Sequence, residues 1–132
     1  MEIVSLASVP PFTTKDGSTI RELLSFRNSE IAAQSLAEAR LAPGGETTAH
    51  VHPATEEIYY LLSGIGLMAI ENETRAVAAG DAIAIPPGKR HQIRNIGVEP
   101  LVLLCCCAPA YSDTDTILCD ALLPSPESDA DR

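Results

Sequence analysis

Short apolar runs of strand length, separated by Gly and Pro, fill the middle of the chain. Glu56–Ser63 is rich in Ile, Tyr and Leu and ends at Gly64, and Pro86-Pro87-Gly88 ends a later run. The predicted strands are Glu56–Ser63, Ile65–Ile70, Thr74–Ala78, Asp81–Ile85, Arg90–Asn95 and Leu101–Cys107. Turn signals at this spacing, with few patterns of helix length between them, predict an all-β sandwich or barrel.

One segment gives two conflicting signals. Glu30–Ala42 is rich in alanine and also contains Leu36, Glu38 and Arg40, so its composition favours a helix. These three residues also alternate with Ala37, Ala39 and Leu41, which is the pattern of a strand. The local pattern leaves both structures open.

Composition and charge narrow the class of protein. The chain has 132 residues, which fits one domain, and its 45% hydrophobic content argues against disorder throughout. Nine basic against eighteen acidic residues give a net charge of −9. An acidic surface does not attract nucleic acid or an anionic membrane, so we expect neither as a partner.

Nothing in the pattern predicts export or membrane insertion. The first ten residues lack the basic region of a signal peptide, and the longest apolar run, Leu101–Ala108, is too short to span a bilayer. Three of the four cysteines are consecutive, at positions 105 to 107, which suits neither a disulfide framework nor a structural zinc site. We therefore expect small buried thiols and a cytoplasmic protein.

The candidate chemistry lies at the three histidines of the chain. His50 and His52 are two residues apart, so on a strand their imidazoles face the same side. Glu57 follows at odd parity, and we expect a bend or bulge at Pro53 to return it to that face. His91 must come from a separate strand. Three imidazoles and one carboxylate would then converge inside the barrel.

Such a ligand set suits one divalent transition metal per chain: Fe, Mn, Ni, Zn or Cu. Four protein ligands leave up to two open positions on a six-coordinate ion, and catalysis needs open positions. The sequence does not choose among these metals.

Two motifs resemble those of the cupin superfamily. From Gly44 to Gly64 the chain reads GGETTAHVHPATEEIYYLLSG, which matches the first cupin motif at Gly44, His50, His52, Glu57 and Gly64. From Gly80 to Asn95 it reads GDAIAIPPGKRHQIRN, which matches the second motif at Gly80, Pro86, Gly88, His91 and Asn95. The fifteen-residue spacer between them is similar to that of small single-domain cupins.

The resemblance implies a single-domain cupin, a jelly-roll-like antiparallel β-barrel. It implies that His50, His52, Glu57 and His91 are metal ligands and that Glu30–Ala42 is a strand. It also implies a homodimer. We expect residues 1–30 to form N-terminal strands or an arm, residues 31–110 the barrel, residues 111–122 a segment packed on it, and residues 123–132 a disordered acidic tail.

Strand parity suggests which side chains face the interior. If Glu57 points inward, so do Tyr59 and Leu61, while the apolar stripe of Ile58, Tyr60 and Leu62 faces outward, where a partner subunit or second sheet would cover it. Ile93 shares the interior with His91, and Arg94 does not. The orientation of Arg40 is open: it either binds an anionic substrate or forms a surface ion pair. Asn95 either supports a ligand or forms a turn.

These features predict a metalloenzyme that acts on a small oxygenated organic molecule. Cupins with these motifs include dioxygenases, isomerases, lyases and cyclases, and we favour a dioxygenase-type reaction slightly. Glu57 and Tyr59 are the candidate catalytic residues, because the chain has no histidine outside the ligand set. The alternative is a cupin that binds or senses a small molecule or a metal without turnover.

Overall fold

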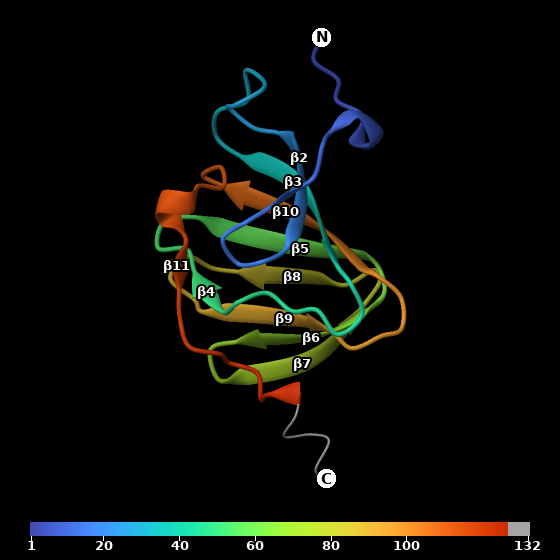
Figure 1. Cartoon of the computed structure of the whole chain (residues 1–132). Helices are drawn as coiled ribbons and strands as arrows, with labels where there is room; N and C mark the ends of the chain where they lie inside the picture. Colours follow the sequence, from blue (N-terminus) through green and yellow to red (C-terminus); the bar gives the residue numbers. More distant parts are fainter. Residues whose placement is uncertain (127–132) are drawn as a thin grey trace.

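Two antiparallel sheets face each other in a computed structural model that describes residues 1–126 (Figure 1). The first sheet has the order β1 (Phe12–Thr13), β2 (Thr19–Leu24), β3 (Ser35–Leu41), β10 (Leu101–Ala108), β5 (Glu56–Ser63) and β8 (Ala82–Ile85). The second has the order β11 (Ile117–Leu118), β4 (His50–Val51), β9 (His91–Asn95), β6 (Ile65–Ile70) and β7 (Glu73–Ala78). Two short 3-10 helices, η1 (Leu6–Ser8) and η2 (Asp113–Asp115), complete the elements. The all-β prediction is confirmed, and no helix of the described part is long and apolar enough to cross a membrane.

The alternation along β5 follows the predicted parity. Glu57, Tyr59 and Leu61 are buried between the sheets, whereas Ile58 and its two outward neighbours are 42–50% exposed. The core between the sheets consists of Ile20, Ala39, Leu41, Tyr59, Leu61, Met68, Ile85, Ile93, Leu101 and Leu103. Burial of these side chains supplies the main driving force that brings the two sheets together.

Within the segment with conflicting signals, Ser35–Leu41 (β3) is a strand, whereas residues 30–34 precede it without regular secondary structure. β3 pairs with β2 along one edge and with β10 along the other, so its backbone hydrogen bonds are made in the middle of the sheet. This tertiary pairing overrides the helical preference of its alanines. Ala37 and Ala39 face the interior, while Arg40 faces outward, where its Nε donates to Glu38 Oε1 at 2.8 Å. Of the two orientations left open for Arg40, the structure has the surface ion pair.

The outer face of β9 is covered by the C-terminal segment. All five residues of β9 are buried, including Arg94 on the side away from the interior. Gln92 Oε1 accepts hydrogen bonds from the backbone of Leu122 and Leu123, and Arg94 Nη2 donates to Pro124 O at 2.7 Å. Leu123, which the sequence reading assigned to the tail, is therefore buried. Residues 127–132 of that expected tail lie outside the described residues, and the division of the chain stays a prediction.

Asn95 performs the turn-forming role rather than supporting a ligand. Its Nδ2 donates to Leu41 O at 3.0 Å and to Glu99 O at 2.7 Å, and its Oδ1 accepts from Gly97 N at 2.9 Å. These bonds tie the end of β9 to the loops beside it. The hydrogen bonds that anchor this end of β9 help fix the strand whose other end carries His91.

Candidate metal centre

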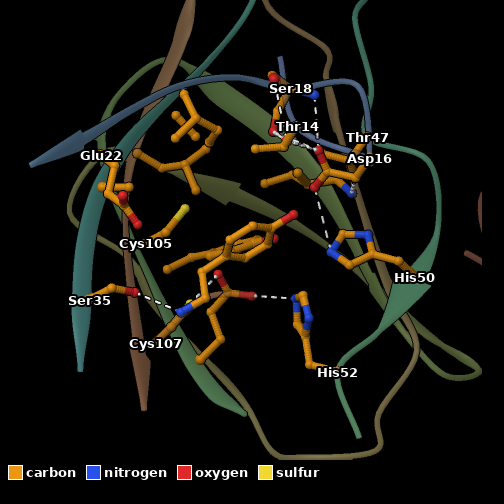
Figure 2. A pocket seen from close by; sticks show the side chains of 18 of the residues that line it. Thr14, Asp16, Ser18, Glu22, Ser35, Thr47, His50, His52, Cys105 and Cys107 are labelled. Carbon is orange, nitrogen blue, oxygen red and sulfur yellow. Dashed lines mark hydrogen bonds and ion pairs between the residues drawn. The ribbon is translucent and has the colours of Figure 1, made fainter. Parts of the chain in front are cut away.

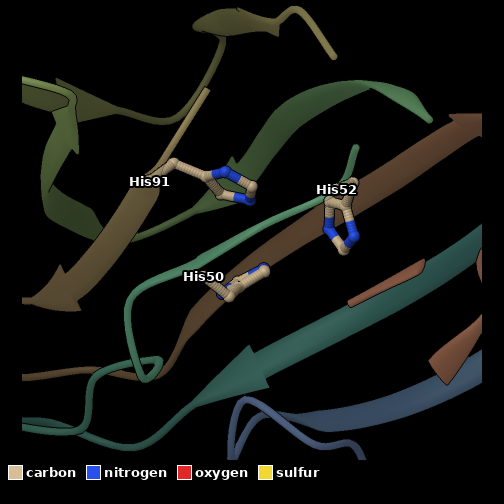
Figure 3. A group of neighbouring side chains, drawn as sticks. All are labelled: His50, His52 and His91. Carbon is tan, nitrogen blue, oxygen red and sulfur yellow. The ribbon is translucent and has the colours of Figure 1, made fainter. Parts of the chain in front are cut away.

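Three histidines meet on the inner side of the second sheet (Figure 3). His50 on β4 pairs directly with His91 on β9, which places their side chains next to each other, with ring centroids 4.2 Å apart. His52 lies one step beyond β4, and its ring centroid is 4.9 Å from that of His50. One nitrogen from each ring lies within 4.8 Å of the other two. The predicted convergence of the three imidazoles is thus present.

Backbone carbonyls fix the tautomer of all three rings. Nδ1 of His50 lies 2.7 Å from Thr48 O, and Nδ1 of His91 lies 3.0 Å from Lys89 O. Nδ1 of His52 lies 3.2 Å from Asp115 O. A carbonyl oxygen only accepts, so each Nδ1 carries a proton, and Nε2 is the nitrogen of each ring that can offer a lone pair to a metal.

Glu57 reaches the histidines from the facing sheet. Its Oε1 lies 3.3 Å from His52 Nε2 and 3.6 Å from His91 Nε2. The sequence reading expected a bulge at Pro53 to return Glu57 to the histidine face. Instead, the chain crosses from β4 to β5 in the other sheet, so the parity of a single strand does not apply. The carboxylate faces the imidazoles across the gap between the sheets.

The charges at this site depend on one another. Burial by itself would raise the pKa of Glu57, but His52 and His91 lower it to about 2. Burial would likewise lower the pKa of His52, but the neighbouring carboxylate of Glu57 outweighs that effect and raises it. Burial and the neighbouring His91 lower the pKa of His50. Glu57 is therefore the anionic group of the cluster, and His50 is neutral.

A cation fits these residues. Among the described residues, Glu57 Oε1 and His91 Nε2 are buried side-chain atoms without a hydrogen-bond partner. Such orphaned atoms are costly in a folded protein, and a divalent ion among the three Nε2 atoms and the carboxylate would satisfy both. The donor set of imidazole nitrogens and one carboxylate oxygen suits a first-row transition metal.

A cavity lined by residues of β2, β3, β5 and β10 extends from the histidines between the sheets. Tyr59 lines it, with its ring centroid 6.0 Å from that of His91. Burial raises the pKa of Tyr59 well above its ordinary value, so its hydroxyl stays protonated at neutral pH and can donate a hydrogen bond to a guest. The sequence prediction that Tyr59 faces the interior is confirmed, and its catalytic role stays a prediction.

Sequence reasoning missed two groups beside the cluster. Asp16, in the loop before β2, directs Oδ2 to within 3.5 Å of His50 Nε2 (Figure 2). The thiol of Cys107 donates to Glu57 Oε2 at 3.2 Å. Burial raises the pKa values of Cys105 and Cys107, so both are protonated thiols at neutral pH. The shared parity of positions 105 and 107 on one strand was a usable signal, whereas nothing in the sequence connects Asp16 with His50.

Comparisons with known proteins agree with this geometry. A family model described as "Cupin domain" matches residues 37–107. The chain is 51% identical over 108 residues to the uncharacterized protein MJ1618 of Methanocaldococcus jannaschii, covering 82% of this chain and 86% of that protein. It is 31% identical over 97 residues to the tetracenomycin polyketide synthase protein TcmJ of Streptomyces glaucescens, covering 74% of this chain and 64% of that protein. The crystal structure of a predicted oxalate decarboxylase from Thermotoga maritima has a TM-score of 0.73 and 25% identity, covering 82% of this chain and 99% of that chain.

Proposed function

The chain belongs to the cupin domain family, and on that premise we propose that it is a metalloenzyme for a small oxygenated organic molecule. His50, His52, Glu57 and His91 would hold one divalent transition metal. The observation that carries this proposal is the fixed tautomer of the three rings, each with Nδ1 on a backbone carbonyl. Three Nε2 atoms beside one unpartnered carboxylate oxygen form a prepared binding site for a cation.

Chemistry at this site would combine the cation with residues of the cavity. The bound ion supplies Lewis acidity, which stabilises negative charge that develops on a substrate oxygen. Tyr59 would donate its hydroxyl proton in a hydrogen bond to an oxygen of the guest. Glu57 would hold its charge beside the imidazoles, because its low pKa keeps it ionised. The apolar walls of β3 and β10 would exclude water.

The type of reaction is a more specific proposal than the metal site. We favour a dioxygenase-type oxidation, and a cyclase, isomerase or lyase reaction uses the same residues without oxygen. The relative TcmJ is named as a polyketide synthase protein, which supports a polyketide-like substrate with several carbonyl groups. Oxygen uptake by the iron-loaded protein with diketones and catechols tests the choice. Conversion with oxygen uptake supports the dioxygenase, conversion without it supports the others, and saturable binding without conversion supports the binding module.

Metal analysis tests the ligand set. Protein purified without chelators is expected to contain about one metal ion per chain, and His52→Ala and Glu57→Ala are expected to lower the occupancy. Arg40→Ala is the matched control, because Arg40 lies on the outer face of β3 and pairs with Glu38. Unchanged occupancy in both site variants would contradict the proposal.

We also propose that the protein is a homodimer of the cytoplasm. The stripe of Ile58, Tyr60 and Leu62 lies exposed on the outer face of β5, and the four cysteines are all free thiols, as a reducing compartment allows. Light scattering should give a dimer for the wild type and a monomer for Tyr60→Lys. Ile65→Lys is the matched control, because Ile65 is similarly exposed on the other sheet, and a dimer is expected to persist in it. A monomeric wild type would contradict the proposal.

A further inference from the structure

The charged residues that line the cavity all have the same sign. Asp16, Glu22 and Glu57 line it, and no lysine or arginine of the described residues does. Arg40, the one basic residue that the sequence suggested for an anionic substrate, points away. Arg27 pairs with Glu22 Oε1 at 2.8 Å, whereas the described basic neighbours of Asp16 and Glu57 are histidines of the cluster. A guest with a free carboxylate therefore finds no lysine or arginine counter-charge among the described residues that line the cavity.

The two carboxylate oxygens of Asp16 differ in their hydrogen bonding. Its Oδ1 accepts hydrogen bonds from Thr14 Oγ1 at 2.7 Å, Ser18 Oγ at 2.7 Å and Ser18 N at 2.9 Å. Its Oδ2 accepts none of these hydrogen bonds, and its near neighbour among the described residues is His50 Nε2 at 3.5 Å. The loop thus holds the carboxylate firmly by one oxygen and directs the other toward the histidine cluster (Figure 2).

We propose that the cavity selects a neutral guest with a hydroxyl or enol group, whose proton is donated to Asp16 Oδ2, and that it discriminates against free carboxylates. The proposal rests on the proposed function, because the guest would place a second oxygen at the metal. Like-charge repulsion from Asp16 disfavours an anionic guest, whereas a hydroxyl donor gains a charge-assisted hydrogen bond. Ala37, Ala39 and Leu41 give the opposite wall an apolar surface that suits a ring or an alkyl chain.

Two small probes of equal shape test this selection. 2′-Hydroxyacetophenone and salicylate offer the same phenol and a neighbouring carbonyl oxygen, but only salicylate carries a carboxylate charge. Binding to the cobalt(II)-loaded protein is followed by the visible absorption of the metal, and binding to the metal-free protein by ligand-observed NMR. In the metal-free protein, where no ion attracts the carboxylate, we expect the ketone to bind at least about tenfold more tightly than salicylate.

Asp16→Asn is the informative variant, because the amide oxygen can still accept the bonds that hold the loop. It should reduce the preference for the ketone by about tenfold in the metal-free protein, where any change in cobalt affinity has no influence. Glu22→Gln removes one charge from the same cavity at a carboxylate already paired with Arg27, on the other side of the cavity from His50 (Figure 2), so the preference should stay as in the wild type.

The possible results distinguish a failure of the charge selection from a failure of the proposed metal site. Failure of the wild type to bind cobalt would contradict the proposed metal site, and the metal-free measurement would still decide the charge preference. Normal cobalt binding with equal or tighter binding of salicylate to the metal-free protein would overturn the inference. An unchanged preference in Asp16→Asn, or an equal change in Glu22→Gln, would also overturn it.

Discussion

The thiol of Cys107 is expected to set the strength of metal binding through Glu57. Cys107 is buried and donates to Oε2 at 3.2 Å, while the other oxygen of that carboxylate faces His52 and His91. The bond thus fixes the rotation of the carboxylate so that Oε1 is directed at the metal position. The thiol stays protonated because burial and the charge of Glu57 both raise its pKa.

Cys107→Val removes this donor and keeps an apolar side chain of similar size. A hydrogen bond to a charged group contributes about 1.5–3 kcal/mol, and a thiol is a weak donor, so we take the lower end of that range. This corresponds to about tenfold weaker metal binding, which agrees with the usual effect of losing a group that orients a ligand. Cys107→Ser restores a donor and should recover part of the loss.

Competition with a chromophoric chelator measures the affinity for Zn(II) or Co(II) in each variant. Cys105→Val is the matched control, because Cys105 lines the same cavity from the same strand and makes no hydrogen bond to Glu57. Wild-type affinity in Cys107→Val would refute the reasoning. An equal loss in Cys105→Val would attribute the effect to packing in the cavity instead.

Three other expectations concern stability and the guest. The pKa of Glu57 is about 2 in the folded protein against an ordinary 4.5, so it contributes about 3 kcal/mol to the metal-free protein above pH 4.5, and this contribution is lost as the pH falls toward 2. Urea unfolding of wild type and Glu57→Gln between pH 6 and pH 3 should show their stabilities converging, and a constant difference would contradict this. Tyr59→Phe should weaken guest binding or turnover and leave metal affinity as in the wild type; a parallel loss of metal would show that Tyr59 acts on the metal site. Gly64→Ala should lower the stability by about 1–3 kcal/mol in thermal unfolding, because Gly64 has φ +92° and a Cβ would lie 3.0 Å from Leu101 Cα; an unchanged melting temperature would contradict this.

The sequence predicted the parts of this molecule that local spacing determines. The separation of His50 and His52 and the alternation along β5 depend only on the two-residue period of a strand, and both are present. The strand state of β3 required the resemblance, because its alanines favour a helix until two neighbouring strands supply hydrogen bonds. The burial of Arg94 was missed, because it depends on a distant segment whose Pro124 O accepts its proton.

The surroundings of the metal centre depend on distance in space rather than along the chain. Glu57 meets the histidines across two sheets, and no strand parity describes that approach. Asp16 and Cys107 approach from a loop 34 residues before His50 and from a strand 50 residues after Glu57. Neither residue belongs to the two motifs that linked His91 with His50, and strand parity alone does not show which residue Cys107 meets. The tertiary structure therefore adds the groups that orient and charge the site.

X-ray absorption spectroscopy of the zinc-loaded protein tests the central claim most directly, that three imidazoles and one carboxylate hold the ion. We expect the zinc ion to have nitrogen and oxygen neighbours at about 2.0–2.1 Å, with the multiple-scattering pattern of three imidazoles. That pattern should be reduced by one imidazole in His91→Ala. Sulfur neighbours at about 2.3 Å would contradict the account, because they would place the ion on the thiols of Cys105 and Cys107 instead.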